Sequence, residues 1–281
     1  MNVFEAIALG IIQGLTEFLP VSSSGHLVLA QKIFGISEPA LLFDTMVHVG
    51  TLAAVFAVLW KDIWAILRRI VQPLTLYLVI ATVPTVIAAL AFRHQLEEAF
   101  KTGHFLGFAF LATAALLVTA ELLAMVSVRK ADLSGEEVPQ EEKKENMNWL
   151  DALVVGIMQA IAVIPGISRS GATLSGALSR GMNRDFAARF SFLLSIPAIL
   201  GAVVFQLKEL ASGEAANAAG SGIGAGAIIA GTLSAAVTGF FAVRLMLKII
   251  REKPLWGFAI YTGILGIFVL IDQSVTHLIR W

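Results

Sequence analysis

Long apolar stretches dominate the chain and predict membrane-spanning helices. Six of them approach or exceed the roughly 20 residues that an α-helix needs to cross the hydrocarbon layer of a bilayer. They cover about 42–60, 73–92, 104–128, 186–207, 222–243 and 255–278. Only 14% of the residues are charged and the mean hydropathy is +0.82, whereas about 25% of residues are charged in a soluble globular domain. We therefore expect an all-α integral membrane protein.

Two further apolar segments, about 3–19 and 149–165, are shorter, and each ends in a polar cluster. A proline follows in each case and then a run of serine and glycine. A short apolar segment with such a helix-breaking end is typical of a re-entrant segment, which is tolerated only where it is buried in protein or lines a cavity. The pattern predicts one re-entrant segment plus three spans, and then the same order again.

The two re-entrant segments are copies of each other. Aligned at an offset of 146 positions, 10–25 and 156–171 share six identities in sixteen positions, where about one is expected by chance. Three predicted crossings separate the copies, and because three is odd the second copy must be inverted. Inverted repeats place their functional site at the repeat interface and use broken helices there. We divide the chain into a first repeat, 1–128, a charged linker, 129–148, and a second repeat, 149–281.

The copies differ at the positions that carry chemistry. The first copy has Glu17, Ser23 and His26 where the second has Val163, Arg169 and Ala172. One half thus supplies a carboxylate, a hydroxyl and an imidazole, and the other half supplies a guanidinium. Together they predict a site for an anion such as phosphate, because guanidinium binds phosphate oxygens bidentately.

The first motif offers several chemical roles. Gln13 and Glu17 are four residues apart, so a helix places both side chains on one face. The Glu17 carboxylate could hold a divalent cation or act as a general base. His26 follows Ser23 by three residues and could lie over it as its base, attack phosphorus itself, or protonate the leaving oxygen. These alternatives stay open at the level of the sequence.

Hydroxyls and glycines surround the reactive groups in both motifs. Backbone N–H groups at a glycine-containing turn beside a helix N-terminus form an anion cradle, and neighbouring hydroxyls fill the remaining acceptor sites. The predicted phosphate-binding residues are Ser22, Ser24, Gly25, Ser168, Ser170, Gly171 and Thr173.

The remaining polar residues within apolar regions favour structural roles. This group consists of Asp44, His48, Glu121 and Asp272, in or at the edges of spans. Glu5 and Asp151 occupy matching repeat positions, where an acid in the first turn stabilises a helix N-terminus.

Charge and cysteine content exclude other classes of protein. The formal net charge is zero, so the chain lacks the basic surface that nucleic-acid binding requires. It has no cysteine, and thiolate metal sites and disulfides are excluded. Basic residues are concentrated in alternate loops, which predicts a cytoplasmic side for those loops and outer positions for both termini.

The strings 13–26 and 165–173 resemble the motifs of undecaprenyl-diphosphate phosphatases of the bacitracin-resistance type, and the resemblance covers essentially the whole chain. It implies a multi-pass enzyme of the bacterial inner membrane that removes the terminal phosphate from a polyprenyl diphosphate and returns the monophosphate carrier to cell-wall synthesis. Its partners would be this lipid substrate and membrane lipids, the site would open toward the outer face, and a homodimer is compatible with it.

The resemblance also implies roles for individual residues. Glu17 would be the catalytic or metal-associated carboxylate, Ser23 and His26 the nucleophile and base candidates, and Arg169 the phosphate-binding residue. Mg²⁺ or Ca²⁺ would be the cofactor. The first acidic position of the family motif is Gln13 here, which offers the metal a neutral oxygen in place of a carboxylate.

A lipid-carrier flippase or an ion-coupled secondary transporter is the alternative. Inverted repeats with re-entrant segments are typical of transporters. Asp44, His48 and Glu121 would then be coupling sites. Release of orthophosphate by purified protein in detergent separates the two hypotheses.

Overall fold

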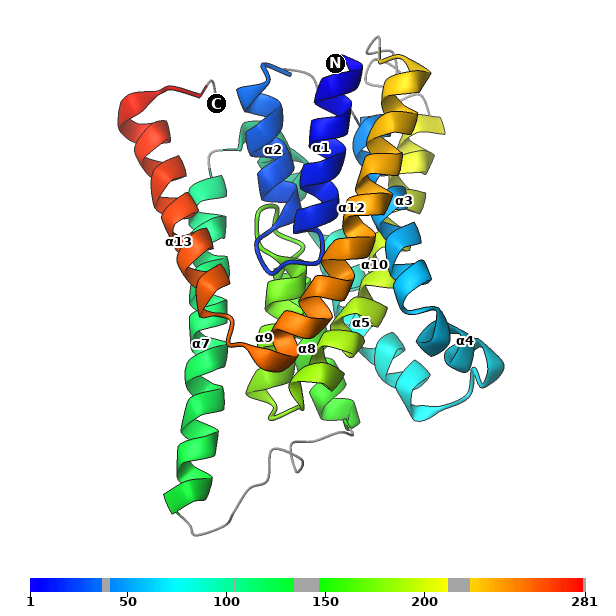
Figure 1. Ribbon diagram of the computed structural model, residues 1–281, viewed down its shortest axis with the longest axis vertical. Coiled ribbons are helices and arrows are strands. Elements are labelled where there is room, and N and C mark those ends of the chain that lie inside the picture. The colour runs from blue at the N-terminus through cyan, green and yellow to red at the C-terminus, as the bar shows by residue number, and fades with distance from the viewer. Residues whose placement is uncertain (37–40, 104, 134–146, 212–222, 280–281) are drawn as a thin grey trace.

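The chain folds into a bundle of helices (Figure 1). The computed structural model describes residues 1–36, 41–103, 105–133, 147–211 and 223–279, and these residues contain no strand. The helices are α1 (Val3–Thr16), α2 (Ser23–Ile33), α3 (Leu41–Val58), α4 (Trp60–Arg68), α5 (Pro73–Ala91), α6 (Arg93–Thr102), α7 (Leu106–Leu133), α8 (Trp149–Ile161), α9 (Arg169–Ser179), α10 (Arg184–Ala211), α12 (Ala225–Glu252), α13 (Trp256–Ile271) and the π-helical turn η2 (Asp272–Thr276).

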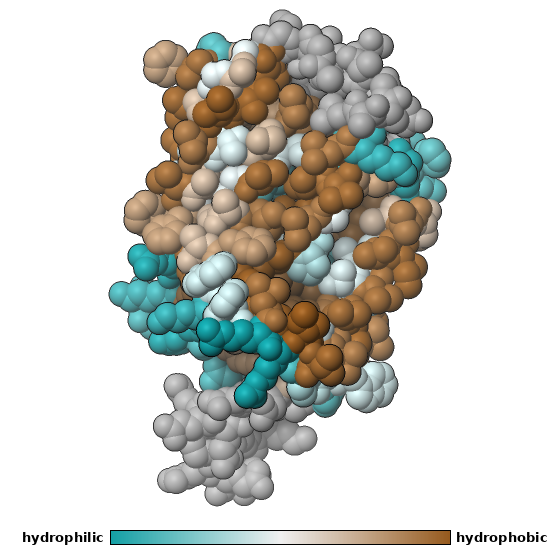
Figure 2. Space-filling model, turned by 90° about the vertical axis from the view of Figure 1, so that its right-hand side faces the viewer, coloured by the Kyte–Doolittle hydropathy of each residue, from teal (hydrophilic) through white to brown (hydrophobic). Residues whose placement is uncertain are grey.

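Six of the described helices are long and apolar enough to cross a membrane. The qualifying segments are Leu41–Val58, Pro73–Ala91, Leu106–Val126, Arg184–Lys208, Ala225–Glu252 and Trp256–Thr276. Each corresponds to one predicted span. The largest difference is in α12, which continues to Glu252 beyond the expected end at 243, because its basic residues lower the hydropathy without ending the helix. Figure 2 shows apolar residues over most of one side of the bundle, as expected of a surface that faces lipid.

The predicted linker, 129–148, begins inside a helix. α7 continues to Leu133, and α8 begins at Trp149 after its N-cap. The intervening residues 134–146 lie outside the described part of the chain. The charged residues from 129 onward therefore mark the end of the apolar segment, whereas the helix itself continues for several more residues.

The two copies of the repeated phrase fold alike locally. α1 and α8 each begin with a capping box, in which Asn2 pairs with Glu5 and Asn148 with Asp151. This confirms the capping role predicted for the two acids. α2 and α9 also begin alike, since the hydroxyls of their N-cap residues, Ser22 and Ser168, each accept a hydrogen bond from the backbone N–H three residues later.

The short helices lie in two halves of the bundle. In Figure 1, α1 and α2 occupy the upper half and α8 and α9 the lower half. α1 packs against α12, and α8 packs against α5. Both contacts are close: a Cβ at Gly10 would collide with the backbone of Gly231, and one at Gly156 would lie 2.6 Å from the carbonyl oxygen of Ala81. Glycine at these positions lets the short helices approach their neighbours through the backbone.

A central apolar cluster supports the ends of the short helices. Phe18, directly after Glu17, is buried and packs edge to face on Phe192 of α10, with ring centroids 5.7 Å apart. The cluster includes residues of α3, α7, α8, α9, α10 and α12. It therefore holds the turn after α1 against the helix that follows the second motif.

Candidate active site

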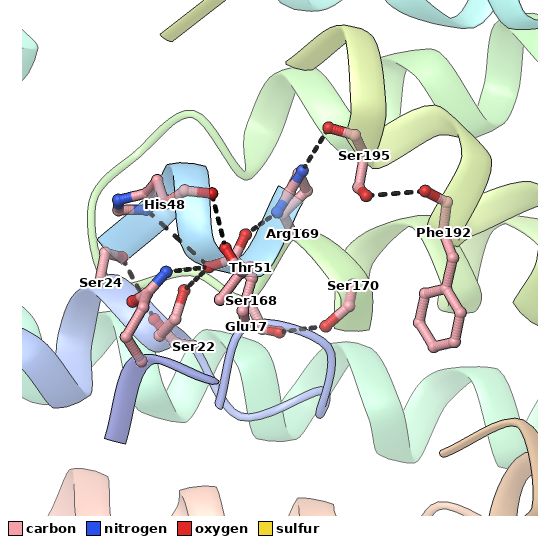
Figure 3. A network of polar contacts seen from close by, with 12 residues as sticks. Glu17, Ser22, Ser24, His48, Thr51, Ser168, Arg169, Ser170, Phe192 and Ser195 are labelled. Atoms are coloured by element: carbon pink, nitrogen blue, oxygen red, sulfur yellow. Dashed lines mark hydrogen bonds and ion pairs between the residues drawn. The ribbon is translucent and has the colours of Figure 1, made fainter. Parts of the chain in front are cut away.

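Glu17 is the centre of a buried polar network (Figure 3). It follows the last residue of α1, and only 5% of its surface is exposed. Its Oε2 accepts hydrogen bonds from Gln13 Nε2 at 2.8 Å and from Ser23 Oγ at 2.6 Å. Its Oε1 accepts one from the Arg169 guanidinium. The carboxylate of the first motif and the cation of the second motif are therefore in direct contact.

Arg169 is held from both sides. It is the first residue of α9, and its Nη1 donates to the carbonyl oxygen of Ser195 in α10 at 3.1 Å while Nη2 donates to Glu17. One-fifth of its side chain is exposed. A partly accessible guanidinium at a helix N-terminus is suited to binding an anion, because both the side chain and the helix end are electropositive.

The turn that presents Ser23 is strained. Ser22 has φ 74° and ψ 94°, a backbone conformation that few residues other than glycine adopt. Its hydroxyl caps α2, and its carbonyl oxygen accepts from the backbone N–H of His26 at 3.1 Å. These contacts stabilise a conformation that costs about 1–3 kcal/mol and that places Ser23 directly at the start of α2.

Two of the predicted phosphate-binding hydroxyls join the two motifs. Ser24 Oγ accepts from the N–H of Gly166 at 3.2 Å, and Ser170 Oγ donates to the carbonyl oxygen of Leu19 at 2.9 Å. Thr173 Oγ1 donates to the carbonyl oxygen of Arg169 at 2.9 Å. In this structure the three hydroxyls therefore hold backbone segments of the site in place.

The two glycines of the predicted cradle leave little room for a side chain. A Cβ at Gly25 would lie 2.7 Å from the Phe110 ring, and one at Gly171 would lie 3.1 Å from the Cβ of Ser168. The helices α2 and α9 begin close to each other, because their first residues, Ser23 and Arg169, both bind Glu17.

His26 is not placed over Ser23. Its Nδ1 donates to the carbonyl oxygen of Ser22 at 2.7 Å, and its Nε2 lies 2.7 Å from the Tyr261 hydroxyl. Its ring also stacks on that of Tyr261, at a centroid distance of 5.7 Å. Ser23 donates to Glu17 instead. The expected geometry of His26 as the base of Ser23 is therefore wrong for this structure, because the first turn of α2 directs the two side chains to different partners.

His48 of α3 lies beside the site, which the sequence did not predict. Its Nδ1 donates to the carbonyl oxygen of Asp44 at 2.6 Å, and its Nε2 lies 3.9 Å from Glu17 Oε2. Thr51 Oγ1 donates to the carbonyl oxygen of His48. The available signal was the polar spacing of Asp44, His48 and Thr51, which share one face of an otherwise apolar span.

The other polar residues of the spans have structural partners. Glu121 binds Arg184 with both oxygens, at 2.9 and 2.6 Å, and accepts the N–H of Leu255. Asp272 caps the end of α13 by accepting from the backbone N–H groups of Leu278 and Ile279.

The residues near Glu17 offer an incomplete metal site. Within the described residues, no group of three or more His, Cys, Asp or Glu side chains is close enough to hold a metal ion. Gln13 Oε1, however, is buried and has no hydrogen-bond partner. The Glu17 carboxylate and this orphaned oxygen are the kind of ligand that Mg²⁺ and Ca²⁺ prefer, and both ions accept further oxygens from phosphates and water.

Comparison with known proteins identifies the family. The sequence profile described as "Bacitracin resistance protein BacA" matches residues 6–268. This chain belongs to the BacA family. The match confirms the family that the two motifs resemble. With six apolar helices, this BacA family member is a multi-pass membrane protein.

Relatives of this BacA family member align over almost their whole length. A protein of Carboxydothermus hydrogenoformans is 45% identical over 98% of both chains. A protein of Alkaliphilus metalliredigens is 39% identical over 96% of this chain and 98% of its own, and one of Methanosphaera stadtmanae is 36% identical over 98% and 99%. All three are named undecaprenyl-diphosphatase.

Proposed function

We propose that this protein hydrolyses undecaprenyl diphosphate to the monophosphate and orthophosphate, which recycles the lipid carrier for cell-wall synthesis. The contact between Glu17 and Arg169 carries the proposal, because it unites the two motifs in one buried site. The names of relatives that align over nearly the full chain support the substrate. They do not favour the transporter or flippase alternative.

The proposal includes an inverted repeat. The halves 1–128 and 149–281 would each contribute a re-entrant pair, α1 with α2 and α8 with α9. The matched capping boxes and N-caps support this, as do the pairings of α1 with α12 and of α8 with α5. Such a duplication would explain why the carboxylate and the guanidinium come from matching motifs of the two halves, at different positions within each motif.

The terminal phosphate would bind where α2 and α9 begin. Arg169 would turn from Glu17 to the phosphate oxygens, with its other nitrogen still on the carbonyl oxygen of Ser195. Backbone N–H groups at the two helix ends would bind the same phosphate. Glu17 and the substrate thus compete for one guanidinium, so the free site is held together by the contact that the substrate replaces.

The chemistry that the geometry supports best is attack by Ser23. Its Oγ would form a bond to the terminal phosphorus, the anhydride bond would break, and the lipid monophosphate would leave. The proton of Ser23 would pass to Glu17, 2.6 Å away. Water would then release orthophosphate from the serine. His26, whose ring nitrogens have other partners, and a directly attacking water are the alternatives.

A divalent cation would complete the charge balance. Glu17 and Gln13 Oε1 would supply its protein ligands and the diphosphate its others, and the ion would neutralise the leaving group. The site would lie in the inner membrane and open toward the outer face, as the family resemblance implies, and the distribution of basic loops would put both termini on that outer side. A homodimer is compatible with the proposal. The molar mass of the protein in detergent, corrected for bound detergent, measures the oligomeric state.

Phosphate release by purified protein in detergent tests the proposal. With no gradient and no second compartment, a phosphatase releases orthophosphate from undecaprenyl diphosphate, whereas a transporter leaves it intact. Arg169→Ala should lower turnover by orders of magnitude, since one preorganised charge contact is worth about 10²–10³-fold, while the protein stays folded. An absence of phosphate release by the parent protein would refute the function.

Ser23→Ala tests the nucleophile separately. If Ser23 attacks, the variant loses turnover, and a phosphoserine at position 23 is detectable by mass spectrometry in rapidly quenched parent protein. Substantial residual turnover in the variant would transfer the role to water or to His26 and would leave the proposed function intact.

A further inference from the structure

Helix α4 (Trp60–Arg68) lies at the end of the bundle and has few contacts with it. It directly follows the apolar span Leu41–Val58, and the next span begins at Pro73. Because both neighbours cross the membrane, residues 59–72 must lie at one membrane surface. α4 packs on α3, and of its residues only Ile63 is buried.

One face of α4 exposes aromatic and aliphatic side chains. Trp60 and Trp64 are 54% and 44% exposed, and their rings stack with centroids 5.7 Å apart. Leu67 continues this face, and the exposed Ile70 and Val71 follow the helix. A tryptophan-containing apolar face at the end of a span is typical of a helix that lies in the headgroup region of a bilayer.

Cations flank the apolar face. Lys61 and Arg68 are seven residues apart and therefore lie in one line along the helix, beside the tryptophans, and the Arg68 guanidinium stacks on the Trp64 ring at 5.2 Å. Arg69 follows at the C-cap, and all three side chains are exposed. Figure 2, which views the side on which α4 lies in Figure 1, shows hydrophilic residues gathered low on a largely apolar face.

The single acid of this region does not cancel the positive charge. Asp62 accepts a hydrogen bond from Arg189 of α10 at 3.3 Å, so its charge is directed toward the bundle. The surface that α4 presents outward is thus an apolar strip bordered by three cations. A partner that matches this surface has an apolar layer beneath a layer of negative charge.

We propose that α4 is a binding surface for anionic phospholipid, with its tryptophans at the boundary of the acyl chains and Lys61, Arg68 and Arg69 on the headgroup phosphates. Zwitterionic lipid satisfies the apolar strip equally well but offers no net charge to the cations. The surface is separate from the site around Glu17, and the inference does not depend on the proposed function.

Quenching of tryptophan fluorescence by brominated lipids tests the proposal. The protein is placed in phosphatidylcholine vesicles that contain a small fraction of brominated phosphatidylglycerol or of brominated phosphatidylcholine. The contribution of α4 is the difference in quenching between the parent and the variant Trp60→Phe/Trp64→Phe, which lacks both tryptophans of the helix. We expect this contribution to show preference for the anionic lipid, by about fivefold for each contributing cation, and the preference to fall in high salt.

Two variants separate charge from packing. Arg68→Gln/Arg69→Gln should lose most of the preference, whereas Arg68→Lys/Arg69→Lys, which keeps the charge, should retain it. Equal quenching of the parent by the two lipids would overturn the proposal, as would a preference that survives the glutamine variant. Should the glutamine variant not fold, the salt dependence of the parent decides the question.

Discussion

At the scale of single residues, the site around Glu17 depends on which partner each ionisable group has. Three groups already bind its two oxygens, and His48 Nε2 lies 3.9 Å from one of them. When Arg169 turns to the substrate, Glu17 loses a cation. Gln13 and Ser23 still donate to it, and His48 is the nearest ionisable group: as imidazolium it would donate from Nε2 to Glu17 while its Nδ1 stays on the carbonyl oxygen of Asp44.

We predict that His48→Leu lowers turnover in the phosphate-release assay about tenfold or more, since it removes a polar group beside a buried carboxylate. Stability should not fall, because leucine is favourable within an apolar span. His94→Leu, in the exposed part of α6, is the matched control and should keep normal turnover. Equal turnover in the two variants would show that His48 plays no part in the reaction.

At the scale of helices, α1 must approach α12 closely to place Glu17. Gly10 makes this contact, and a Cβ there would collide with the backbone of Gly231. We predict that Gly10→Ala destabilises the protein by about 1–3 kcal/mol, as overpacking does, and lowers turnover, because the shift of α1 moves Glu17.

Gly201→Ala is the control for Gly10→Ala. It lies in helix α10, where an added Cβ has nothing within 4 Å. Because alanine favours a helix by up to about 1 kcal/mol over glycine, its unfolding temperature in detergent should stay the same or rise. If Gly10→Ala behaves like this control, the close approach of α1 and α12 is not needed.

The helices were also the part of the structure that the sequence predicted best. All six apolar segments correspond to helices, since a span needs only length and hydropathy. For the short α2 and α9 only a helix N-terminus beside a turn was predicted, and not their extent, because their serines and glycines indicate turns in water. In the structure those residues form the N-caps and the tightly packed first turns of the two helices.

The sequence predicted which residues form the candidate site but not which of them bind one another. The motifs named Glu17, Ser23 and Arg169, and the expected inverted repeat predicted that the two motifs would meet. The sequence did not predict that Ser23 donates to Glu17 and that His26 binds Tyr261, because this depends on side-chain directions within a single turn of α2. His48 comes from a different helix, and no local pattern connects it with Glu17.

At the scale of the whole molecule, a buried ion pair connects three distant segments. Glu121 of α7 binds Arg184, the first residue of α10, and also accepts the N–H of Leu255 between α12 and α13. Glu121 is 2% exposed. A buried pair of this kind adds little net stability over an apolar pair, but either charge left alone is costly.

We therefore predict that Arg184→Met destabilises the protein by about 3–5 kcal/mol, because it leaves the Glu121 carboxylate buried without its cation. Glu121→Gln/Arg184→Met should recover most of this loss, since it removes both charges and keeps an oxygen for the N–H of Leu255. Unfolding temperatures in detergent measure the coupling, and strictly additive effects would contradict it. Turnover of the folded double variant should be normal, because the pair has no contact with Glu17 or Arg169. A loss of turnover in that variant would instead assign the pair a role in the reaction, as the transporter alternative requires of Glu121.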